Sequence, residues 1–467
     1  MILRKAGRPM SSAVVLGLVG LMLAACTGSG GGSDPGGSGG DGSSCPTPSS
    51  SFDDQDELLQ RMTTALQAHH RSAFLKLAGT QPVERSMRMW WRNVSALGFT
   101  TGAVNPLGQA KNSRHPFIFQ IGVHNRLDPL DHKQPQVSGT RYKLTVTHAG
   151  RGCGRVVISG WKPLSNAPWD SRKPLTVVKT AHTVVAGEPA VAAQIRRVAR
   201  LAEKAATWNF TLLRTVHKMN YLEQKGFVTF VAANTREAST WFRPKDAPKP
   251  KGWAADPGNV AGFEYPMPGV QVWPSIKAHK VSASPTGGSR VVITPRGVHA
   301  GDVNLEGTLV HEYTHAIFRV NDLWSWAGGD PVSAATAEGA ARWFEAMFHS
   351  NPRSARGTLR SLTMLEPVIE SRPFTGRLPT DREIYGAASS ADYYYDLSAS
   401  AFSYLAAAYG AGFAIQSIVD AYLNGGGPFG GVVDSIKGGT IRFEAPPAVQ
   451  RRWASWVRGG FPVPAPN

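Results

Sequence analysis

The 467-residue sequence contains 50 lysine and arginine residues against 33 aspartate and glutamate residues, which gives a formal net charge of +17. This excess of positive charge favours anionic partners such as phosphate-rich envelope polymers or lipid headgroups. Nucleic acid is not expected as a partner, because the basic residues are spread along the chain without a basic-aromatic motif.

Residues 1–25 have the pattern of an export signal. Three basic residues, Arg4, Lys5 and Arg8, precede an apolar stretch that is shorter than the roughly 20 residues needed to span a bilayer. The stretch ends in LAAC, which resembles the bacterial lipobox, and the resemblance implies that Cys26 is lipidated and becomes the mature N-terminus. We therefore expect a lipid anchor on the extracytoplasmic face of the cell membrane. The alternative is an ordinary cleaved signal peptide with an incidental cysteine.

Residues 26–51 are predicted to form a flexible tether. The segment is rich in glycine and serine and has almost no apolar side chain to bury. The two remaining cysteines are Cys45, near the end of this tether, and Cys153. In an oxidising compartment the simplest pairing is one disulfide between them, and two unrelated free thiols are the alternative.

Residues 52–175 predict a first domain that combines helices with antiparallel strands. Apolar residues at helical spacing run from Phe52 to Ala78, and the adjacent His69 and His70 are read as turn or solvent residues because they cannot share a helical face. A period of two then appears in the segments PFIFQIGV, RYKLTVT and RVVISGW. This order of elements resembles the nuclear-transport-factor-type or cystatin-like rolls of exported bacterial proteins, which implies an antiparallel α+β roll.

Residues 176–467 predict a second domain that is mainly helical with a small edge sheet. Strands are expected in LTVVKTAHTVVAG, GFVTFVAA and SRVVITP, and helices over Glu188–Trp208 and TREASTWF. The two domains together place the protein in the α+β class.

The segment TLVHEYTHAIF carries the clearest chemical signal. His311 and His315 are four residues apart, so in a helix both imidazoles lie on one face and could bind a single metal ion. Glu312 projects beside that face, where a carboxylate can take a proton from a bound water. The alternative is a helix with two partly buried histidines that hydrogen-bond to their neighbours, although each polar tip would then need a partner.

A catalytic zinc site needs a third protein ligand and an open position for water. Glu338 follows His315 by 23 residues, which leaves room for a loop and an antiparallel return helix. The pair HEYTH and AEGAARWFE resembles the gluzincins, specifically the peptidase-MA-like zinc metallopeptidases. The resemblance implies His311, His315 and Glu338 as zinc ligands and Glu312 as general base. Glu345, two turns after Glu338, is a candidate for orienting a ligand from behind, and a solvent carboxylate is the alternative.

The segment DYYYDLSASAFSYLAAAYG is similar to the C-terminal helical segment of the same family, in which a catalytic tyrosine precedes a leucine. Counting back ten residues from Leu405 gives Tyr395, with Tyr394 and Tyr393 beside it. The resemblance implies that this phenol donates a hydrogen bond to the oxyanion of the tetrahedral intermediate. Aromatic packing is the alternative for the triplet, and Tyr394 is the main rival of Tyr395.

Two departures restrict what the resemblance implies. The family usually has a tryptophan-leucine pair before E-G, whereas this chain has Ala335 and Thr336, so the entry of that helix into the site stays open. Zinc aminopeptidases also have a G-x-M-x-N strand that holds the free amine of the substrate, and the upstream segments SRVVITP and RGVHAGD lack it. The resemblance covers about residues 180–460, with its specific part at 308–348 and 393–410.

We therefore expect a membrane-anchored extracytoplasmic zinc metallopeptidase, with Zn²⁺ as cofactor and a peptide or protein as substrate, and endopeptidase cleavage is favoured. The alternative is a catalytically inert zincin-fold lipoprotein that serves as a binding or assembly module of the envelope. A third reading is a roll domain that binds a small ligand or a cell-wall fragment, with the peptidase half as support.

Overall fold

The structure is a computed structural model, and it confirms the predicted α+β class. The predicted signal segment, the predicted tether, and Cys26, Cys45 and Cys153 lie outside the described residues. The described residues are 52–106, 117–128, 136–149, 155–214, 224–242, 260–271, 286–319, 332–350, 369, 372–386, 391–424, 427–429, 433–437, 440–444 and 446–461.

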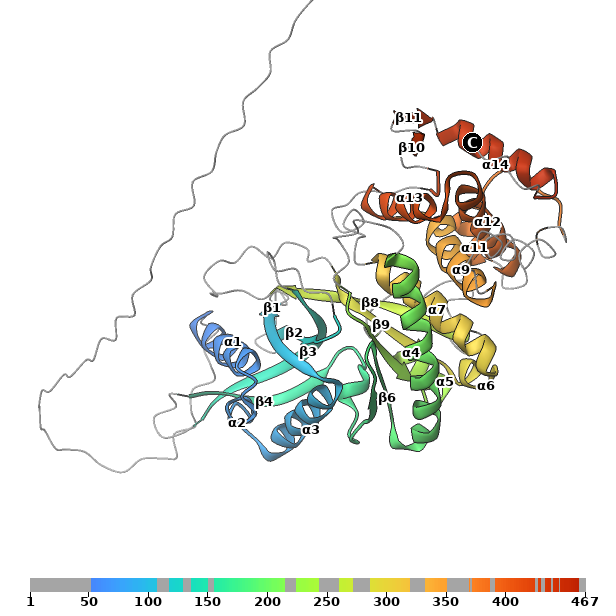
Figure 1. The fold of residues 1–467 in the computed structure, drawn as a ribbon. Coiled ribbons are helices and arrows are strands. Elements are labelled where there is room, and N and C mark those ends of the chain that lie inside the picture. Colours follow the sequence, from blue (N-terminus) through green and yellow to red (C-terminus); the bar gives the residue numbers. More distant parts are fainter. Residues whose placement is uncertain are drawn as a thin grey trace, which may run out of the picture. The chain divides into compact units, whose positions relative to one another are not determined.

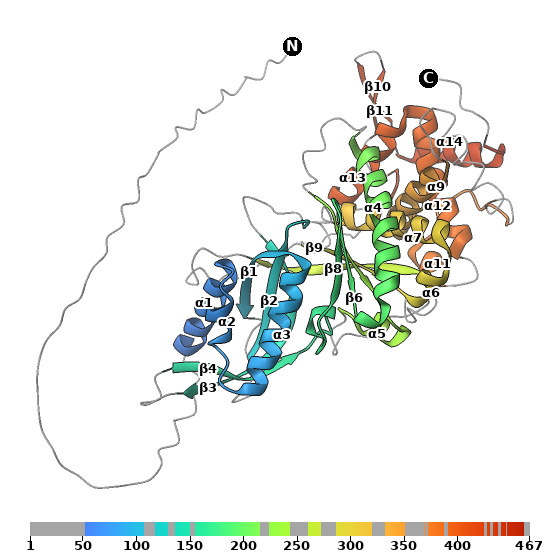
Figure 2. The same ribbon diagram turned by 60° about the horizontal axis from the view of Figure 1, so that its bottom comes forward.

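The first part of the fold is a four-stranded antiparallel sheet with three helices beside it (Figures 1 and 2). The longest of these helices, α3, is capped by Thr80, whose side chain accepts a hydrogen bond from the backbone of Val83. At its other end the cap is Gly98, which has a φ of 92° that favours glycine. The elements are α1 (Phe52–Gln67), α2 (Arg71–Leu75), α3 (Gln81–Leu97), β1 (Phe99–Pro106), β2 (Phe117–Asn125), β3 (Gln136–Ala149) and β4 (Arg155–Pro163).

A mixed sheet follows, in the order β8-β9-β7-β6-β5, and three of its strands, β6, β7 and β9, are parallel. Residues 136–138 of β3 pair with residues 269–271 of β8, so the hydrogen-bonded ladder crosses the predicted boundary at residue 175. The division into two domains stays a prediction. The elements are β5 (Thr176–Lys179), β6 (Thr183–Gly187), α4 (Ala192–Arg214), β7 (Phe227–Val231), α5 (Thr235–Thr240), β8 (Gly262–Gln271) and β9 (Thr286–Ile293).

The C-terminal part is largely helical, and its helices gather together in both views (Figures 1 and 2). Helix α7 packs against α4, α9 and strand β8, and α9 packs against α12. The elements are α6 (Pro295–His299), α7 (Asp302–Arg319), α9 (Ala334–Ser350), α11 (Asp381–Gly386), α12 (Ala391–Tyr409), α13 (Ala411–Asn424), β10 (Val433–Lys437), β11 (Thr440–Glu444) and α14 (Pro446–Arg458).

The central strands bury both faces. In β6, Val184 belongs to the core of the first part and Val185 to the core under the C-terminal helices, and Val292 and Val291 of β9 alternate in the same way. Side chains alternate along a strand, so the near-continuous apolar runs of these strands are explained by two separate cores. The sheet therefore provides a well-packed surface against which α7 lies.

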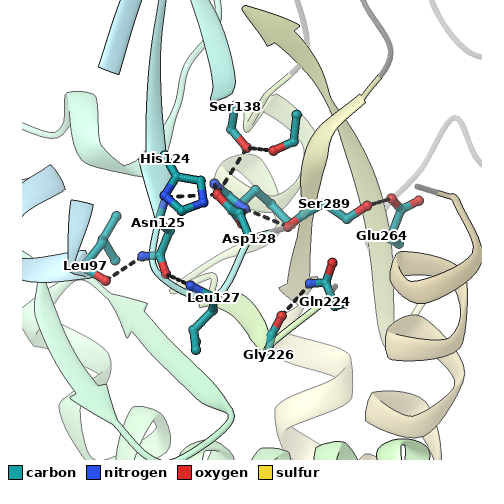
Figure 3. Close-up of polar contacts among 12 residues, drawn as sticks. Leu97, His124, Asn125, Leu127, Asp128, Ser138, Gln224, Gly226, Glu264 and Ser289 are labelled. Carbon is teal, nitrogen blue, oxygen red and sulfur yellow. Dashed lines mark hydrogen bonds and ion pairs between the residues drawn. The ribbon is translucent and has the colours of Figure 1, made fainter. Parts of the chain in front are cut away.

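A buried ion pair joins the two parts of the sheet. Asp128, after β2, contacts Arg290 of β9 through two hydrogen bonds of 2.6 and 2.8 Å, and both side chains are at most 3% exposed. The Asp128 carboxylate also accepts hydrogen bonds from the backbone of Asn125 at 3.1 Å and from the hydroxyl of Ser138 at 3.4 Å (Figure 3). Each charge is thus compensated inside the protein, as burial requires.

Across the part of the chain that the structure describes, no helix combines the length and apolarity needed to cross a bilayer.

Candidate metal centre

Helix α7 is held against the sheet by a tyrosine between the two histidines. The Tyr313 ring stacks on Phe227 of β7, with 3.9 Å between ring centroids and 4° between planes, and its hydroxyl forms a 2.8 Å hydrogen bond with Thr229. Because residues two positions apart in a helix point in different directions, this contact turns His311 and His315 away from β7.

Three donor atoms converge in front of α7. Nε2 of His311 lies 3.2 Å from Nε2 of His315, and each of these nitrogens lies 3.3 Å from Oε2 of Glu338 on α9. The three side chains are only 9–12% exposed. Within the described segments, this is the one group of histidine, cysteine or acidic side chains that could hold a metal ion.

The size of this triangle fits a divalent cation. A regular tetrahedron with edges of about 3.3 Å has its centre about 2.0 Å from each corner, which is the usual distance from zinc to imidazole nitrogen or carboxylate oxygen. Two imidazoles and one carboxylate leave one of four tetrahedral positions open to solvent or a substrate. The residues present therefore fit a metal site with a free coordination position.

The charges of the three groups depend on one another. Burial opposes a charge on His311, but hydrogen bonds to Glu338 and Glu345 outweigh burial and raise the pKa of His311 to about 10. Burial likewise favours the neutral form of Glu338, but the neighbouring His315 and His311 hold the pKa of this carboxyl well below its usual range. The site is thus built to keep Glu338 as a carboxylate, the form that binds a cation.

Glu338 and His311 are each oriented by a further side chain. The hydroxyl of Tyr385, on α11, donates a 2.9 Å hydrogen bond to Oε1 of Glu338. Oε2 of Glu345 lies 3.5 Å from Nδ1 of His311, and Glu345 also pairs with Arg342 at 2.9 Å. Such contacts fix the orientation of metal ligands. The Nδ1 atom of His315 is buried and has no such partner in the segments that the structure describes.

The pattern A-T before Glu338 does not prevent its helix from reaching the site. The backbone of Ala334 donates a 2.8 Å hydrogen bond to Asp381, and the N–H of Thr336 donates one of 3.2 Å to the hydroxyl of Ser333. These hydrogen bonds stabilise the first turn of α9, so the helix forms there without a tryptophan-leucine pair.

The glycine after Glu338 allows α9 and α12 to approach closely. A Cβ added to Gly339 would lie 2.8 Å from the carbonyl carbon and the Cβ of Ser398, closer than side chains pack. Ser398 follows Tyr395 by three residues on α12. The close crossing therefore places Tyr395 near Glu338.

Glu312 lies beside the triangle and is not one of its corners. It is 8% exposed and lines the same cavity as the three donors. Burial raises the pKa of Glu312, although His311 and His315 partly oppose the rise. A carboxylate with a raised pKa is a stronger base than an ordinary glutamate.

Of the three adjacent tyrosines, Tyr395 lines the cavity. Its ring stacks beside His311 with 6.0 Å between centroids, and burial together with the charge of Glu338 raises its pKa. Tyr393 is buried in the apolar core, where its hydroxyl approaches the backbone of Pro373 at 3.5 Å, and Tyr394 packs against Tyr393. A phenol with a raised pKa keeps its proton and can donate a hydrogen bond.

The cavity in front of the triangle has a volume of about 710 Å³. One wall of the cavity is the start of strand β8, which was not predicted from the sequence. Glu264 on this strand accepts a hydrogen bond from Ser289 (Figure 3). The strand was missed because Pro266 and Pro268 interrupt its alternating pattern. Tyr385 was missed because it lies in a short helix that carries no recognisable motif. The cavity is lined by Val260, Ala261, Gly262, Phe263, Glu264, Arg296, Thr308, His311, Glu312, His315, Glu338, Arg342, Glu345, Ala391, Asp392 and Tyr395.

His69 and His70 lie elsewhere: the His69 ring packs near Trp91 and Phe99, and His70 is exposed.

Comparison of the chain with protein-family models, with curated proteins and with solved structures gives no match.

Proposed function

We propose that the protein is a zinc-dependent peptidase that hydrolyses peptide bonds within a chain. The observation that supports this proposal is the triangle of His311, His315 and Glu338 with a buried carboxylate, Glu312, beside it in an open cavity. Two imidazoles and a carboxylate with an open position are the donor set of catalytic zinc in hydrolases. A bound zinc ion would supply Lewis acidity, which polarises a carbonyl and makes water a nucleophile at neutral pH.

Glu312 provides the proton transfers of the proposed reaction. Its buried carboxylate accepts a proton from the attacking water and then gives that proton to the amine that leaves. A raised pKa suits both steps, because the group must hold the proton between them.

Tyr395 is the proposed donor to the oxyanion. Its protonated hydroxyl lies in the cavity on the Glu338 side of the site, where it can hydrogen-bond to the negative charge that develops on the carbonyl oxygen.

Strand β8 is the proposed seat of the substrate backbone. Residues 262–266 pair with β9 on one side, whereas among the described residues the pairing with β3 covers only residues 269–271. An extended peptide could therefore add to the other edge of residues 262–266, which also form a wall of the cavity. The sequence GFEYP at this edge does not follow the G-x-M-x-N pattern of aminopeptidases, which favours cleavage inside a chain.

The location is part of the same proposal. The lipobox-like LAAC at Cys26 and the glycine-rich tether support a lipid-anchored enzyme on the extracytoplasmic face of the membrane, with a peptide or protein substrate.

The test combines metal analysis with a peptide-library digest. Purified protein is expected to contain about one zinc ion per chain and to cleave peptides, and Glu312→Gln is expected to keep the zinc but to lose about 10²- to 10⁴-fold in turnover. Asp302→Asn is the matched control, because Asp302 lies on the same helix in exposed ion pairs with α4. Equal turnover by Glu312→Gln would show the mechanism to be wrong, and zinc without cleavage would favour the inert binding module.

A further inference from the structure

A second large cavity, of about 730 Å³, lies in the first part of the fold and shares none of its described lining residues with the cavity of the metal centre. Its walls come from α3, the start of α2, the end of β4 and the segment after residue 169. The cavity is lined by Arg71, Pro82, Arg85, Ser86, Arg88, Met89, Trp90, Arg92, Trp161, Pro163, Asp170, Ser171 and Arg172.

Unpaired positive charge concentrates in this lining. Arg85, Arg88 and Arg92 form one stripe of α3, because their spacings are three and four residues. Among them, Arg88 is paired with Glu84, whereas Arg85 and Arg92 have no ion pair or hydrogen bond to a side chain within the described segments. Like charges at these spacings destabilise a helix, so a bound anion would relieve a repulsion that the fold leaves in place.

Two further arginines face the same cavity from other elements. Arg71 begins α2 and Arg172 follows Asp170, and neither has an ion pair in the part of the chain that the structure describes. Asp170 is the single acidic residue among the described residues of the lining. Its two oxygens already accept hydrogen bonds, at 2.9 Å from the hydroxyl of Tyr142 and at 3.3 Å from the backbone of Ala167. The cavity thus has a net positive charge that its own acid does not balance.

A partly exposed aromatic ring lies among these guanidinium groups. Trp161 of β4 is partly exposed and lines the cavity, and its inner side rests on Tyr142 and Trp90, with centroid distances of 4.9 and 6.1 Å. The face of an indole ring is electron-rich and apolar, which suits the C–H face of a sugar ring. The packing behind Trp161 holds this ring in place before any ligand arrives.

The cavity continues into a neighbouring hollow of about 280 Å³. The two share Pro163, Asp170 and Ser171, and the second adds one cation, Lys162, and one acid, Glu188, which is paired with Lys173 at 3.3 Å. A groove that runs from the arginine-lined cavity into this hollow suits an extended ligand better than a compact one, with the anionic part of the ligand in the first cavity.

We propose that this groove binds a phosphorylated glycan. Guanidinium groups bind phosphate through paired hydrogen bonds, a phosphate group offers acceptors to several arginines at once, and the ring of Trp161 provides the surface for the sugar. The groove would hold the protein on an anionic polymer, and this binding is independent of peptide hydrolysis at the metal centre.

Calorimetric titration of the protein tests the proposal with four probes: a phosphomannan, the same mannan after removal of its phosphate, inorganic polyphosphate, and vesicles of anionic phospholipid. We expect the phosphomannan to bind at least tenfold more tightly than the dephosphorylated mannan. Arg85→Gln with Arg92→Gln should weaken that binding tenfold or more. The matched control, Arg196→Gln with Arg236→Gln, removes the same charge from exposed positions of α4 and α5 and should change binding less than twofold.

Trp161→Leu separates the sugar surface from charge alone. It should weaken binding of the phosphomannan but leave binding of inorganic polyphosphate unchanged, and circular dichroism checks that the variant folds. The proposal is overturned if Arg85→Gln with Arg92→Gln binds phosphomannan as tightly as the control pair, or if only the vesicles bind. These outcomes do not depend on zinc or on peptidase activity, so they are distinct from a failure of the proposed function.

Discussion

The hydroxyl of Tyr385 donates a hydrogen bond of 2.9 Å to Oε1 of Glu338, while Oε2 of the same carboxylate lies 3.3 Å from Nε2 of both histidines. Oε1 is thus fixed by Tyr385, and Oε2 points towards the position that a cation would occupy. The tyrosine fixes the carboxylate for contact through a single oxygen.

Removing this hydroxyl should weaken metal binding. Tyr385→Phe is expected to lower zinc affinity about 10- to 100-fold, because such supporting hydrogen bonds are worth that much at metal sites. Competition with a fluorescent chelator measures the affinity, and Tyr394→Phe serves as the control because Tyr394 does not line the cavity. Unchanged affinity in Tyr385→Phe would argue against Glu338 as a ligand.

Tyr395→Phe should lower turnover more than zinc affinity, the reverse of Tyr385→Phe. Loss of one donor to the oxyanion lowers kcat about 10²- to 10³-fold. The Tyr395 hydroxyl also hydrogen-bonds to Glu338, but none of the three proposed ligands is changed, so zinc affinity should fall less than tenfold. Steady-state kinetics on a cleaved peptide and the same chelator competition measure the two effects. Loss of zinc with little change in kcat would instead make Tyr395 a positioning residue for Glu338.

Chelation should lower thermal stability. A ligand that binds only the folded protein stabilises it by about 4 kcal/mol at a free concentration of 1,000 Kd, so removal of zinc withdraws that contribution. The melting temperature should fall on addition of a chelator and recover on addition of zinc. His315→Ala should melt at one temperature with and without the chelator, and a chelator effect of equal size in that variant would contradict the site.

The Asp128–Arg290 ion pair should be essential for stability. Asp128→Ala leaves Arg290 charged and buried, which costs about 3–5 kcal/mol in unfolding free energy. Glu383→Gln is a matched control, because Glu383 forms a similar twofold contact with Arg377 at 2.7 Å but at the surface. Its loss should cost less than about 1 kcal/mol. Urea unfolding compares the two, and equal costs would refute the argument from burial.

Glu203 should make stability depend on pH. Partial burial favours its neutral form, but hydrogen bonds from Thr180 and from the backbone and ring of His182 outweigh burial and lower the pKa of Glu203. A lowered pKa stabilises the fold above the unfolded value of about 4.3, and this contribution is lost as the pH falls through the folded pKa. The stability difference between wild type and Glu203→Gln, measured by urea unfolding, should therefore be largest near pH 6 and shrink towards pH 3. A difference that stays constant would refute this assignment.

The sequence predicts the helices of the site well because each has local information. The four-residue spacing in HEYTH and the alanine-rich segment after Glu338 both encode helices, and α7 and α9 occur there. Strand β8 was missed because Pro266 and Pro268 break the pattern, and they are tolerated where pairing is incomplete. The roles of Tyr385 and Asp128 depend on partners 47 and 162 residues away, which no local pattern encodes.

The contact between Asp128 and Arg290 also sets an order of events during biogenesis. Arg290 follows Asp128 by 162 residues, so a nascent chain that emerges from its N-terminus cannot neutralise this aspartate until well over half of its length has been delivered. Contacts of such long range slow folding and leave intermediates exposed to aggregation. The polypeptide should therefore acquire its resistance to proteases late, after β9 has been synthesised.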